Sequence, residues 1–236
     1  MGSVKSVILL GAPGSGKGTQ AKGLVSKFST WKHISTGDLF RKEIASKSPL
    51  GLEVKDTIDK GNLVSDEITN KVFESQLEKI LTGGESVEQI ILDGYPRNPG
   101  QSRNLLSLIE RREDLDIEQP VVVELVVPEN ELVERLSGRL LNPRNGRVYH
   151  KTQNPPKLPG ICDDDGGPLI QRADDEEATV RDRFSIYSRE ADGIKDVLCG
   201  PCEHKSVNGS LAVDQITSEI EKSLGLTEDS TSERDL

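Results

Sequence analysis

The sequence predicts an α/β protein with a central parallel β-sheet flanked by helices. Short runs rich in valine, isoleucine and leucine recur along the chain with helical patterns between them, an alternation typical of this class. Aromatic residues make up only 3% of the 236 residues, so branched aliphatic side chains must fill the core, as they do in buried parallel sheets. The first such run leads directly into a glycine-rich loop that opens a helix.

Five short runs are expected to form the strands. In chain order they are SVILL (6 to 10), KHIS (32 to 35), IILDG (90 to 94), VVVELVV (121 to 127) and KSVNG (205 to 209), of which KHIS and KSVNG are the weaker. Helical periodicity fits five segments, at 16 to 28, 65 to 81, 99 to 113, 129 to 140 and 176 to 198. Ser65 and Asp66, followed by Glu67, have the residue types of a helix start.

One internal segment breaks this alternation. Residues 141 to 168 are dense in proline, glycine, asparagine and aspartate, and the stretch is much longer than an ordinary connection. Such a stretch is either a functional lid or disordered, and its apolar residues favour a small folded insert: Val148, Tyr149, Leu158 and Ile161. Residues 227 to 236 lack periodicity and carry acidic charge, so we expect a flexible tail there.

Charge and hydropathy argue against several classes of function. The 40 Asp and Glu residues outnumber the 30 Lys and Arg residues, and a net charge of −10 disfavours non-specific binding to nucleic acid or to anionic membranes. No apolar run approaches the roughly 20 residues that span a bilayer, and the first residues run straight into the glycine-rich loop. We therefore expect a soluble, cytoplasmic protein.

The three cysteines do not form a disulfide framework. Cys199 and Cys202 have the spacing of a redox dithiol, but such a pair acts at a strand-to-helix turn. Here the pair is expected to follow a helix and to precede a short strand. The favoured interpretation is a Gly-Pro turn between small side chains, with a redox role as the weaker alternative.

The loop GAPGSGKGT, residues 11 to 19, predicts a phosphate-binding site. Its glycines allow successive backbone N–H groups to converge on phosphate oxygens, and the following helix directs its positive N-terminus at the same anion. Lys17 adds a cation for the outer phosphates. One position is unusual, because Gly18 stands where the common phosphate loop has a serine or threonine for magnesium.

Two further clusters follow expected strands. Thr36, Asp38 and Arg41 come after a short strand, with Arg41 about one helical turn beyond Asp38; alone, this cluster could be a capped surface helix. In DGYPRNPGQ, Asp93 ends a strand near the phosphate loop, where a carboxylate suits a hydrated magnesium ion. Arg97 is expected to clamp a phosphate. Gln101 offers the paired donor and acceptor that can read a purine edge.

Four arginines form the last set. Arg135 and Arg139 are expected one helical turn apart, and Arg172 and Arg183 flank the stretch ADDEEATV. A surface ion pair is the commoner role of any single arginine. Phosphoryl transfer, however, depends on charge neutralisation and alignment rather than on a protein nucleophile, so many fixed guanidinium groups are its expected signature.

These segments, taken in order, resemble the adenylate kinases with a long lid, within the nucleoside monophosphate kinases. The likeness runs through GAPGSGKGTQ, ISTGDLFR, GNLVSDE, DGYPRNPGQ, ERLSGR, GRVYH, NPPK and LIQRADDEEATVRDR. It implies a P-loop nucleoside triphosphate hydrolase-like fold with a five-stranded parallel sheet. It further implies a core at 1–34, 65–138 and 178–226, a helical AMP-binding insert at 35–64 and a lid at 139–177.

By that resemblance the protein is a monomer that transfers a phosphoryl group reversibly from ATP to AMP, giving two ADP, in adenine nucleotide homeostasis. The ATP-binding residues would be Gly14, Ser15, Gly16, Lys17, Gly18, Thr19, Arg135, Arg139, Val148, Tyr149 and Leu211. The AMP-binding residues would be Thr36, Arg41, Leu63, Val64, Gly94, Arg97, Gln101, Arg172 and Arg183. The catalytic cations would be Lys17, Arg97, Arg139, Arg172 and Arg183.

The resemblance also accounts for the unusual glycine in the phosphate loop. The family has glycine after the lysine, so Gly18 conforms and Thr19 supplies the nearby hydroxyl. Magnesium is then expected to be held mainly by nucleotide phosphates and waters, with Asp93 assisting through a coordinated water.

The lid departs from the metal-binding members of the family. Their lids carry Cys-x2-Cys and, after sixteen residues, a second Cys-x2-Cys in which the last cysteine can be an aspartate. At these four places this chain has Asn142, Asn145, Cys162 and Asp165. Amides are poor zinc ligands. We therefore expect a lid without zinc, held by hydrogen bonds among these side chains, with Asn142 and Asn145 able to donate to Asp165. The alternative is that the four residues are independent solvated loop positions, since Asn and Asp are common in turns.

Three alternatives stay open. The same chemistry could use a GTP donor or a CMP or UMP acceptor, although Gln101 and the long lid favour AMP. A phosphate-loop switch would need a guanine-reading Asn-Lys-x-Asp, and the nearest stretch, NKVF at 70 to 73, lacks the aspartate. The third alternative is a nucleotide-binding protein without catalytic activity. The presence of every charged residue of the motifs argues against it.

Overall fold

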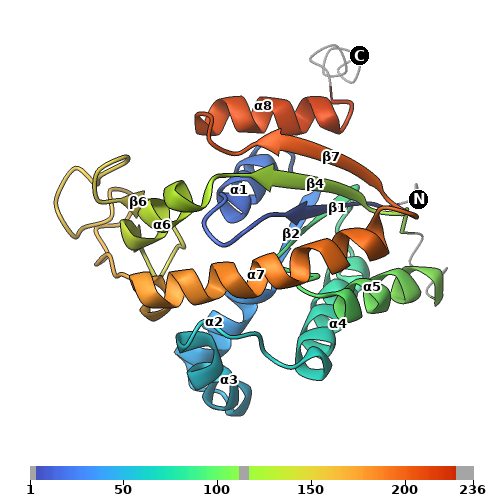
Figure 1. Ribbon diagram of the computed structural model, residues 1–236, viewed down its shortest axis with the longest axis horizontal. Coiled ribbons are helices and arrows are strands. Elements are labelled where there is room, and N and C mark those ends of the chain that lie inside the picture. The colour runs from blue at the N-terminus through green and yellow to red at the C-terminus, as the bar shows by residue number, and fades with distance from the viewer. Residues whose placement is uncertain (1–3, 112–116, 227–236) are drawn as a thin grey trace.

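A five-stranded, entirely parallel sheet lies at the centre of the molecule, in the order β2-β3-β1-β4-β7 (Figure 1). The computed structural model describes residues 4–111 and 117–226, so the predicted tail at 227–236 lies outside the described residues. All five predicted strands are confirmed, as β1 (Lys5–Leu10), β2 (Trp31–Ser35), β3 (Gln89–Asp93), β4 (Val121–Val126) and β7 (Glu203–Asn208).

Helices cover both faces of this sheet. One face carries α1 (Lys17–Lys27) and α8 (Val213–Ser223), and the other carries α4 (Asp66–Thr82), α5 (Pro99–Arg111) and α7 (Glu177–Leu198). Because side chains alternate along a strand, β1 supplies both cores. Val7 and Leu9 pack under α1 and α8, whereas Ile8 and Leu10 pack under α4, α5 and α7. The fold class predicted from the sequence is confirmed.

Most helix predictions are confirmed, and one helix was missed. Ser65 caps α4 as expected, accepting a hydrogen bond from the Ile68 N–H at 3.5 Å. Helix α8 was not predicted, although Ile216 and Ile220 have helical spacing and are almost fully buried. Gln20 on α1 holds this helix in place, because its amide donates to the Val213 carbonyl at 3.0 Å.

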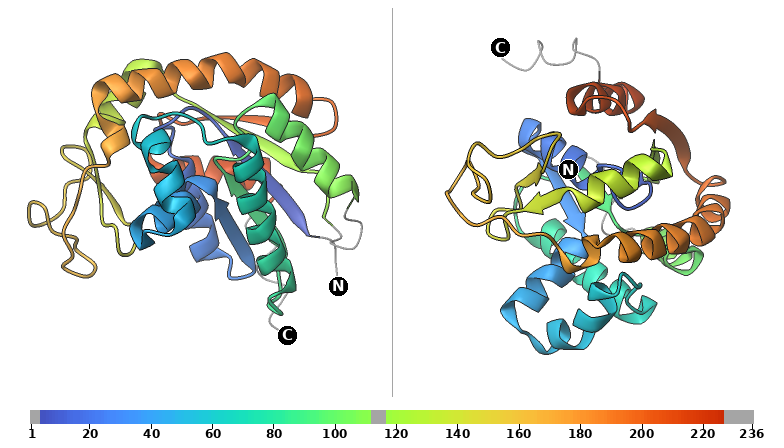
Figure 2. Two further views of the ribbon diagram at one scale, coloured as in Figure 1. Left: turned by 90° about the horizontal axis from the view of Figure 1, so that it is seen from below. Right: turned by 60° about the vertical axis from the view of Figure 1, so that its left-hand side comes forward.

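Two inserts project from the core (Figures 1 and 2). The helical insert consists of α2 (Thr36–Ser46) and α3 (Pro49–Asp59), with a small core of its own around Phe40, Val54 and Val64. The lid contains the antiparallel strands β5 (Arg139–Leu141) and β6 (Val148–His150) and a long loop. The lid lies at the left of Figure 1 and the helical insert at the bottom, with α7 passing between them.

The predicted helix at 129 to 140 is wrong in its last three residues. Helix α6 (Glu129–Ser137) ends before Gly138, and Arg139 begins a strand. Gly138 lets the His150 ring pack directly against the end of the helix, because a Cβ atom there would stand only 2.0 Å from Nε2 of His150. Arg135 and Arg139 therefore lie on different elements and do not share a helical face.

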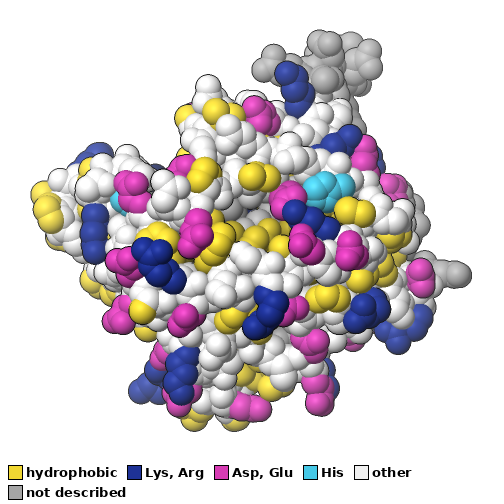
Figure 3. Space-filling view, viewed as in Figure 1, with side chains coloured by type: hydrophobic (Ala, Val, Ile, Leu, Met, Phe, Trp, Pro, Cys, Tyr) yellow, Lys and Arg dark blue, Asp and Glu magenta, His cyan; other side chains and the backbone are white. Residues whose placement is uncertain are grey.

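The surface matches the mixed charge of the sequence. Acidic and basic side chains are interspersed over the face in Figure 3, without a broad basic field. No described helix is long and apolar enough to cross a membrane.

Candidate active site

The phosphate loop leaves the carboxyl end of β1, the central strand, where ligands bind in open parallel sheets. Gly14 and Gly16 have positive φ angles of 88° and 97°, which L side chains rarely adopt. At Gly14 a Cβ atom would also approach Cγ of Leu136 to 2.9 Å. Helix α1 begins directly at Lys17, so the unpaired N–H groups of its first turn face the loop.

Lys17 folds back over this loop. Its Nζ donates hydrogen bonds to the carbonyl oxygens of Gly11 at 2.7 Å and Ala12 at 3.0 Å. Burial lowers the pKa of Lys17 to about 8, and although Asp93 opposes this shift, the charges of neighbouring arginines add to it. A bound polyphosphate would raise the pKa of Lys17 again, since an opposite charge favours the protonated ammonium.

Asp93 lies beside the loop, as predicted. A Cβ atom on Gly18 would come to 3.3 Å from Oδ2 of Asp93, so glycine at this position leaves the carboxylate uncrowded. Burial on its own would raise the pKa of Asp93, but the adjacent imidazole of His33, 3.4 Å away, and the charge of Lys17 lower it to about 2. The carboxylate is therefore ionised at neutral pH. Thr19 is exposed at the start of α1.

The segments after β2 and β3 meet at the same edge of the sheet. The hydroxyl of Thr36 donates to the Gly94 carbonyl at 2.7 Å, and Nε of Arg97 donates to the same oxygen at 2.9 Å. Gly94 has a φ of 73°, and a Cβ atom there would stand 2.8 Å from Nη2 of Arg97. Arg97 is exposed at this point, so its guanidinium is accessible to a ligand.

A cavity opens between these segments and the helical insert. Arg41 lies on its wall and is paired with Asp38, one helical turn before it, at 2.6 Å. Of the residues predicted from the sequence, those that line it are Thr36, Arg41, Leu63, Val64, Arg97, Gln101 and Arg183. Seven predicted positions from four separate segments therefore converge on one cavity.

Gln101 is held by the protein at both ends of its amide. Its side chain is 1% exposed. Its Oε1 accepts from the Arg97 N–H at 2.8 Å, and its Nε2 donates to Oδ1 of Asp66 at 2.9 Å. Each end of the amide thus has a protein partner, while one N–H and one lone pair of the amide are left over.

The arginines at the lid base are paired with two adjacent carboxylates. These are Asp174 and Asp175, in the short 3₁₀ turn (Ala173–Asp175) before α7. Asp175 is fully buried and accepts from Nε of Arg139 at 2.8 Å and from its Nη2 at 2.5 Å. Asp174 pairs with Arg183 at 2.8 Å. The two-nitrogen fork on Asp175 fixes the plane of the Arg139 guanidinium, whereas Arg183 is held through its Nη1 alone.

Arg172 has no comparable pair within the described residues. Its Nε is buried without a hydrogen-bond partner. Burial lowers the pKa of Arg172, and the charges of Arg139 and Arg41 lower it further. A buried cation surrounded by other cations is costly, so this end of the cavity favours an anion.

Arg135 does not contact the carboxylates that bind Arg139 and Arg183; it lies beside the segment that follows β7. Its Nη2 donates to the Gly209 carbonyl at 2.8 Å and pairs with Glu131. A Cβ atom on Gly209 would lie 3.4 Å from the Ser15 carbonyl. The segment that contains Leu211 is thereby held between the phosphate loop and α6.

The lid network is confirmed in one contact and corrected in another. Asn142, fully buried, donates to Oδ1 of Asp165 at 2.7 Å. The prediction that Asn145 also donates to Asp165 is wrong, because its Nδ2 lies 3.6 Å from Sγ of Cys162. The side-chain Oδ1 of Asn145 accepts from the Arg147 N–H at 2.8 Å, and its Nδ2 donates to the sulfur of Cys162.

The two lid residues predicted to contact ATP lie on β6. Val148 is paired with Leu141 of β5. Tyr149 is 3% exposed, and its hydroxyl accepts from the Asp163 N–H at 2.8 Å and contacts Sγ of Cys162 at 3.6 Å. The tyrosine ring is therefore committed to the lid interior, which leaves backbone atoms of this strand for a nucleotide.

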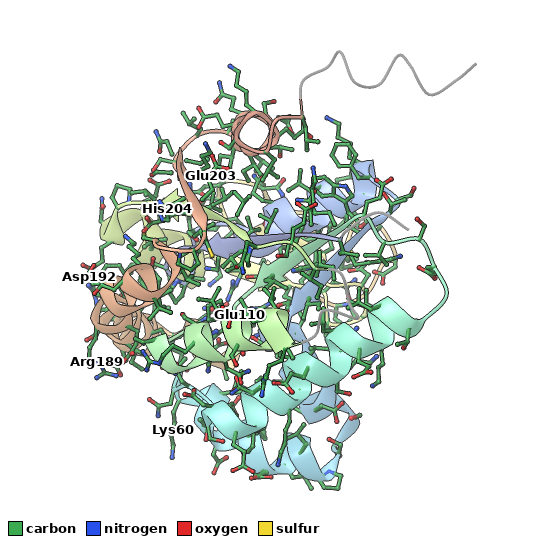
Figure 4. All side chains as sticks on the ribbon, turned by 90° about the vertical axis from the view of Figure 1, so that its right-hand side faces the viewer. Lys60, Glu110, Arg189, Asp192, Glu203 and His204 are labelled. Carbon is green, nitrogen blue, oxygen red and sulfur yellow. The ribbon has the colours of Figure 1, made fainter. Side chains whose placement is uncertain are left out.

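The Cys-Gly-Pro-Cys turn lies away from these residues. It joins the end of α7 to β7, at the end of the molecule seen in Figure 4, where Arg189, Asp192, Glu203 and His204 mark the two elements. Cys199 is exposed and Cys202 is buried, and burial raises the pKa of Cys202 to about 11. A thiol with a raised pKa is a poor nucleophile, which agrees with the interpretation of a structural turn.

Sequence reasoning missed the acidic and imidazole side chains that hold the site residues in place: Asp174 and Asp175 beside arginines, His33 beside Asp93, and Asp66 beside Gln101. Asp174 and Asp175 were noticed only as part of the stretch between two arginines, although paired acids in that place were a signal. His33 directly precedes the Ile-Ser-Thr stretch, and Asp66 was interpreted only as a helix start. The contacts of Asp174 and Asp175 with arginines, of His33 with Asp93 and of Asp66 with Gln101 join residues that are far apart in the chain or lie on different elements.

The arrangement can bind two anions end to end. Lys17 and the glycine loop form one anion site, Arg41 and Arg97 line a second, and guanidinium groups from the lid base and α7 lie between them. The side chains of Arg97, Arg139 and Arg183 all lower the pKa of Lys17, which shows that their charges are felt at the loop. Fixed cations around two anion sites suit the transfer of a phosphoryl group between them.

Comparison with known proteins identifies relatives of the whole chain. The family model described as Adenylate kinase matches residues 9–198. A protein named Adenylate kinase from Staphylococcus epidermidis is 39% identical over 215 residues, covering 91% of this chain and 96% of the relative. One of the same name from Staphylococcus aureus has the same identity and coverage.

Proposed function

Because the chain belongs to the adenylate kinase family, we propose that it transfers the terminal phosphoryl group of ATP reversibly to AMP, giving two ADP, in a Mg²⁺-dependent reaction. The convergence of Lys17, Arg97, Arg139 and Arg183 on one site carries this proposal. The chain is a phosphotransferase of this family, and its contribution to adenine nucleotide homeostasis follows from the reaction.

The donor side of the proposed site is the phosphate loop. The N–H groups of Gly14, Ser15, Gly16, Gly18 and Thr19 hold the ATP phosphates, and Lys17 leaves its loop carbonyls to meet the outer ones. Arg135 and the segment with Leu211 approach the base and ribose, and β6 adds backbone contacts from the lid. Because the base would be contacted mainly by backbone atoms, ATP and GTP have to be compared directly as donors.

The acceptor side is the cavity under the helical insert. Arg41 and Arg97 hold the AMP phosphate, Leu63 and Val64 contact the base, and Gln101 reads its edge. Thr36 and Gly94 shape the wall between them. Arg139, Arg172 and Arg183 neutralise the charge that spreads over the phosphoryl oxygens during transfer. In this assignment the core is 1–34, 65–138 and 178–226, the AMP-binding insert 35–64 and the lid 139–177.

Asp93 is the residue that suits Mg²⁺. The ion prefers hard oxygen ligands and keeps several waters, so one ionised carboxylate next to bound phosphates is enough to hold it through a water. The low pKa of Asp93 and the room left by Gly18 fit this role. When bound with ATP, the ion supplies charge neutralisation and fixes the phosphate geometry.

The protein acts as a soluble cytoplasmic monomer in this proposal, with nucleotides as its ligands. The scattered surface charge of Figure 3 and the net charge of −10 support the exclusion of nucleic acid and membrane partners.

A panel of acceptors tests the proposal. With Mg²⁺ and ATP, the turnover number divided by KM is expected to be highest for AMP among AMP, CMP, UMP and GMP, because Gln101 and the apolar wall around Val64 suit adenine. The measurement is a coupled assay of ADP formation, repeated with GTP as donor. A better rate with CMP or UMP would assign the chain to another acceptor.

The lid gives a second prediction, that it is folded without zinc. Asn142→Ala is expected to lower the free energy of unfolding by about 1–3 kcal/mol, because it removes a buried hydrogen bond, and Asp165→Ala is expected to lower the melting temperature. Asp164→Ala is the matched control, since the Asp164 side chain is exposed and pairs with Arg147 at 3.8 Å on the lid surface.

The same melting experiment tests whether the lid holds a structural zinc ion. A chelator is expected to leave the melting temperature unchanged. About one zinc ion per chain by elemental analysis, together with a lower melting temperature in chelator, would show a structural metal site instead.

A further inference from the structure

The amide of Gln101 is held in one orientation by a carboxylate. Oδ1 of Asp66 accepts hydrogen bonds from Nε2 of Gln101 at 2.9 Å and from Nδ2 of Asn98 at 2.7 Å. A carboxylate offers acceptors only, so both amides must turn their NH₂ groups toward it. The Oε1 atom of Gln101 must then face the other way, where it meets the Arg97 N–H at 2.8 Å.

The carboxylate itself has little freedom to move. Asp66 is the first residue of α4, directly after the capping Ser65. Its Oδ2 lies against the start of α5, where a Cβ atom on Gly100 would stand 2.8 Å away. Asn98 is fixed in turn, because its Oδ1 accepts from the Gln101 N–H at 2.8 Å. Two helix starts thus clamp one buried amide.

We propose that Asp66 is a specificity-determining residue, which acts together with the Arg97 N–H to lock the amide of Gln101 in a single orientation toward the acceptor base. This inference rests on the proposed function. The amide keeps one free N–H and one free lone pair for a ligand, in an order that Asp66 fixes. Asp66 does not line the cavity within the described residues, so it is a positioning residue rather than a catalytic one.

The order of these groups distinguishes two purines of almost equal size. The pairing edge of adenine presents an amino donor next to a ring-nitrogen acceptor, which matches a lone pair next to an N–H. Hypoxanthine presents a carbonyl next to a ring N–H, which is the reverse order. An amide free to turn over can match either edge, whereas a locked amide leaves polar groups unpaired against hypoxanthine, and such mismatches give strong discrimination.

The test compares AMP with IMP as acceptor. Asp66→Ala is expected to reduce the ratio of turnover number over KM for AMP to that for IMP by about tenfold or more. The change should appear as a higher KM for AMP and a lower KM for IMP, with KM for ATP and the turnover number nearly unchanged. Asp66→Asn should largely restore the ratio, because its Oδ1 can still accept both hydrogen bonds.

Two further variants separate this role from a structural one. Asp66→Ser keeps a residue suited to a helix start, but its hydroxyl can donate or accept, so it should relax selectivity even if Asp66→Ala does not fold. Glu67→Ala is the matched control, since it removes the neighbouring acid, whose exposed partner is Lys71 at 2.8 Å, and should keep the selectivity of the unmodified protein.

The outcomes distinguish the inference from the function on which it rests. If the unmodified protein does not use AMP, the proposed function is wrong. If it prefers AMP to IMP and folded Asp66→Ala or Asp66→Ser keeps that preference unchanged, the proposed function stands and the lock by Asp66 is wrong.

Discussion

Arg97→Ala is expected to reduce the turnover number by about 10²–10³-fold while the protein stays folded. The guanidinium lies where the segments after β2 and β3 meet, anchored by one hydrogen bond to the Gly94 carbonyl and otherwise accessible. Its charge reaches the phosphate loop, since it lowers the pKa of Lys17. Alanine removes a charge-assisted donor to the reacting phosphate and little packing.

Steady-state kinetics with ATP and AMP measure this effect. Arg97→Lys should recover only part of the loss, because an ammonium keeps the charge but lacks the planar fork. Arg103→Ala is the control, an exposed arginine on α5 outside the site. If folded Arg97→Ala turned over at nearly the normal rate, the phosphate clamp would have to lie elsewhere.

Lys17→Met is expected to reduce the turnover number over KM for ATP by a similar factor, about 10²–10³-fold. Methionine keeps much of the length and apolar volume of the side chain but cannot neutralise phosphate charge. The folded protein lowers the pKa of Lys17 to about 8, so the folded state binds this proton less tightly than the unfolded chain does. Removal of the charge is therefore not expected to unfold the protein.

Lys17→Met is compared with the unmodified protein only if the two have the same melting temperature, so that a loss of activity cannot come from unfolding. Lys27→Met on the same helix is the control, because Lys27 pairs with Glu221 at 2.8 Å on the surface. A Lys17→Met protein with normal KM for ATP and normal turnover would contradict the assignment of the phosphate loop as the donor site.

The local parts of this architecture were readable from the sequence because each depends on neighbouring residues. The buried run before Gly11 could only be a central strand, and glycines with a lysine after such a strand form an anion site. Ser65 capped a helix where its residue type indicated. The conclusion that Gly18 suits Asp93 needed the structure, since it depends on a distance across two strands.

The errors share a physical cause, which is competition between local preference and contacts distant in sequence. Arg139 continues a helical pattern, yet pairing with β6 and packing of His150 against Gly138 place it in a strand. Asn145 was expected to donate to Asp165, but its amide donates to Cys162, 17 positions away. The partners of the arginines could not be assigned from spacing alone, because Arg139 meets a carboxylate 36 positions away.

The most direct measurement of the central claim is the stoichiometry of the reaction. The purified protein is incubated with ATP, AMP and Mg²⁺, and all phosphorus-containing species are followed by ³¹P NMR. We expect two ADP for each AMP consumed without release of inorganic phosphate, and equal amounts of ATP and AMP when ADP is the only starting nucleotide. Formation of ADP and inorganic phosphate with AMP left unchanged would contradict the account, because the chain would then hydrolyse ATP rather than transfer its phosphoryl group.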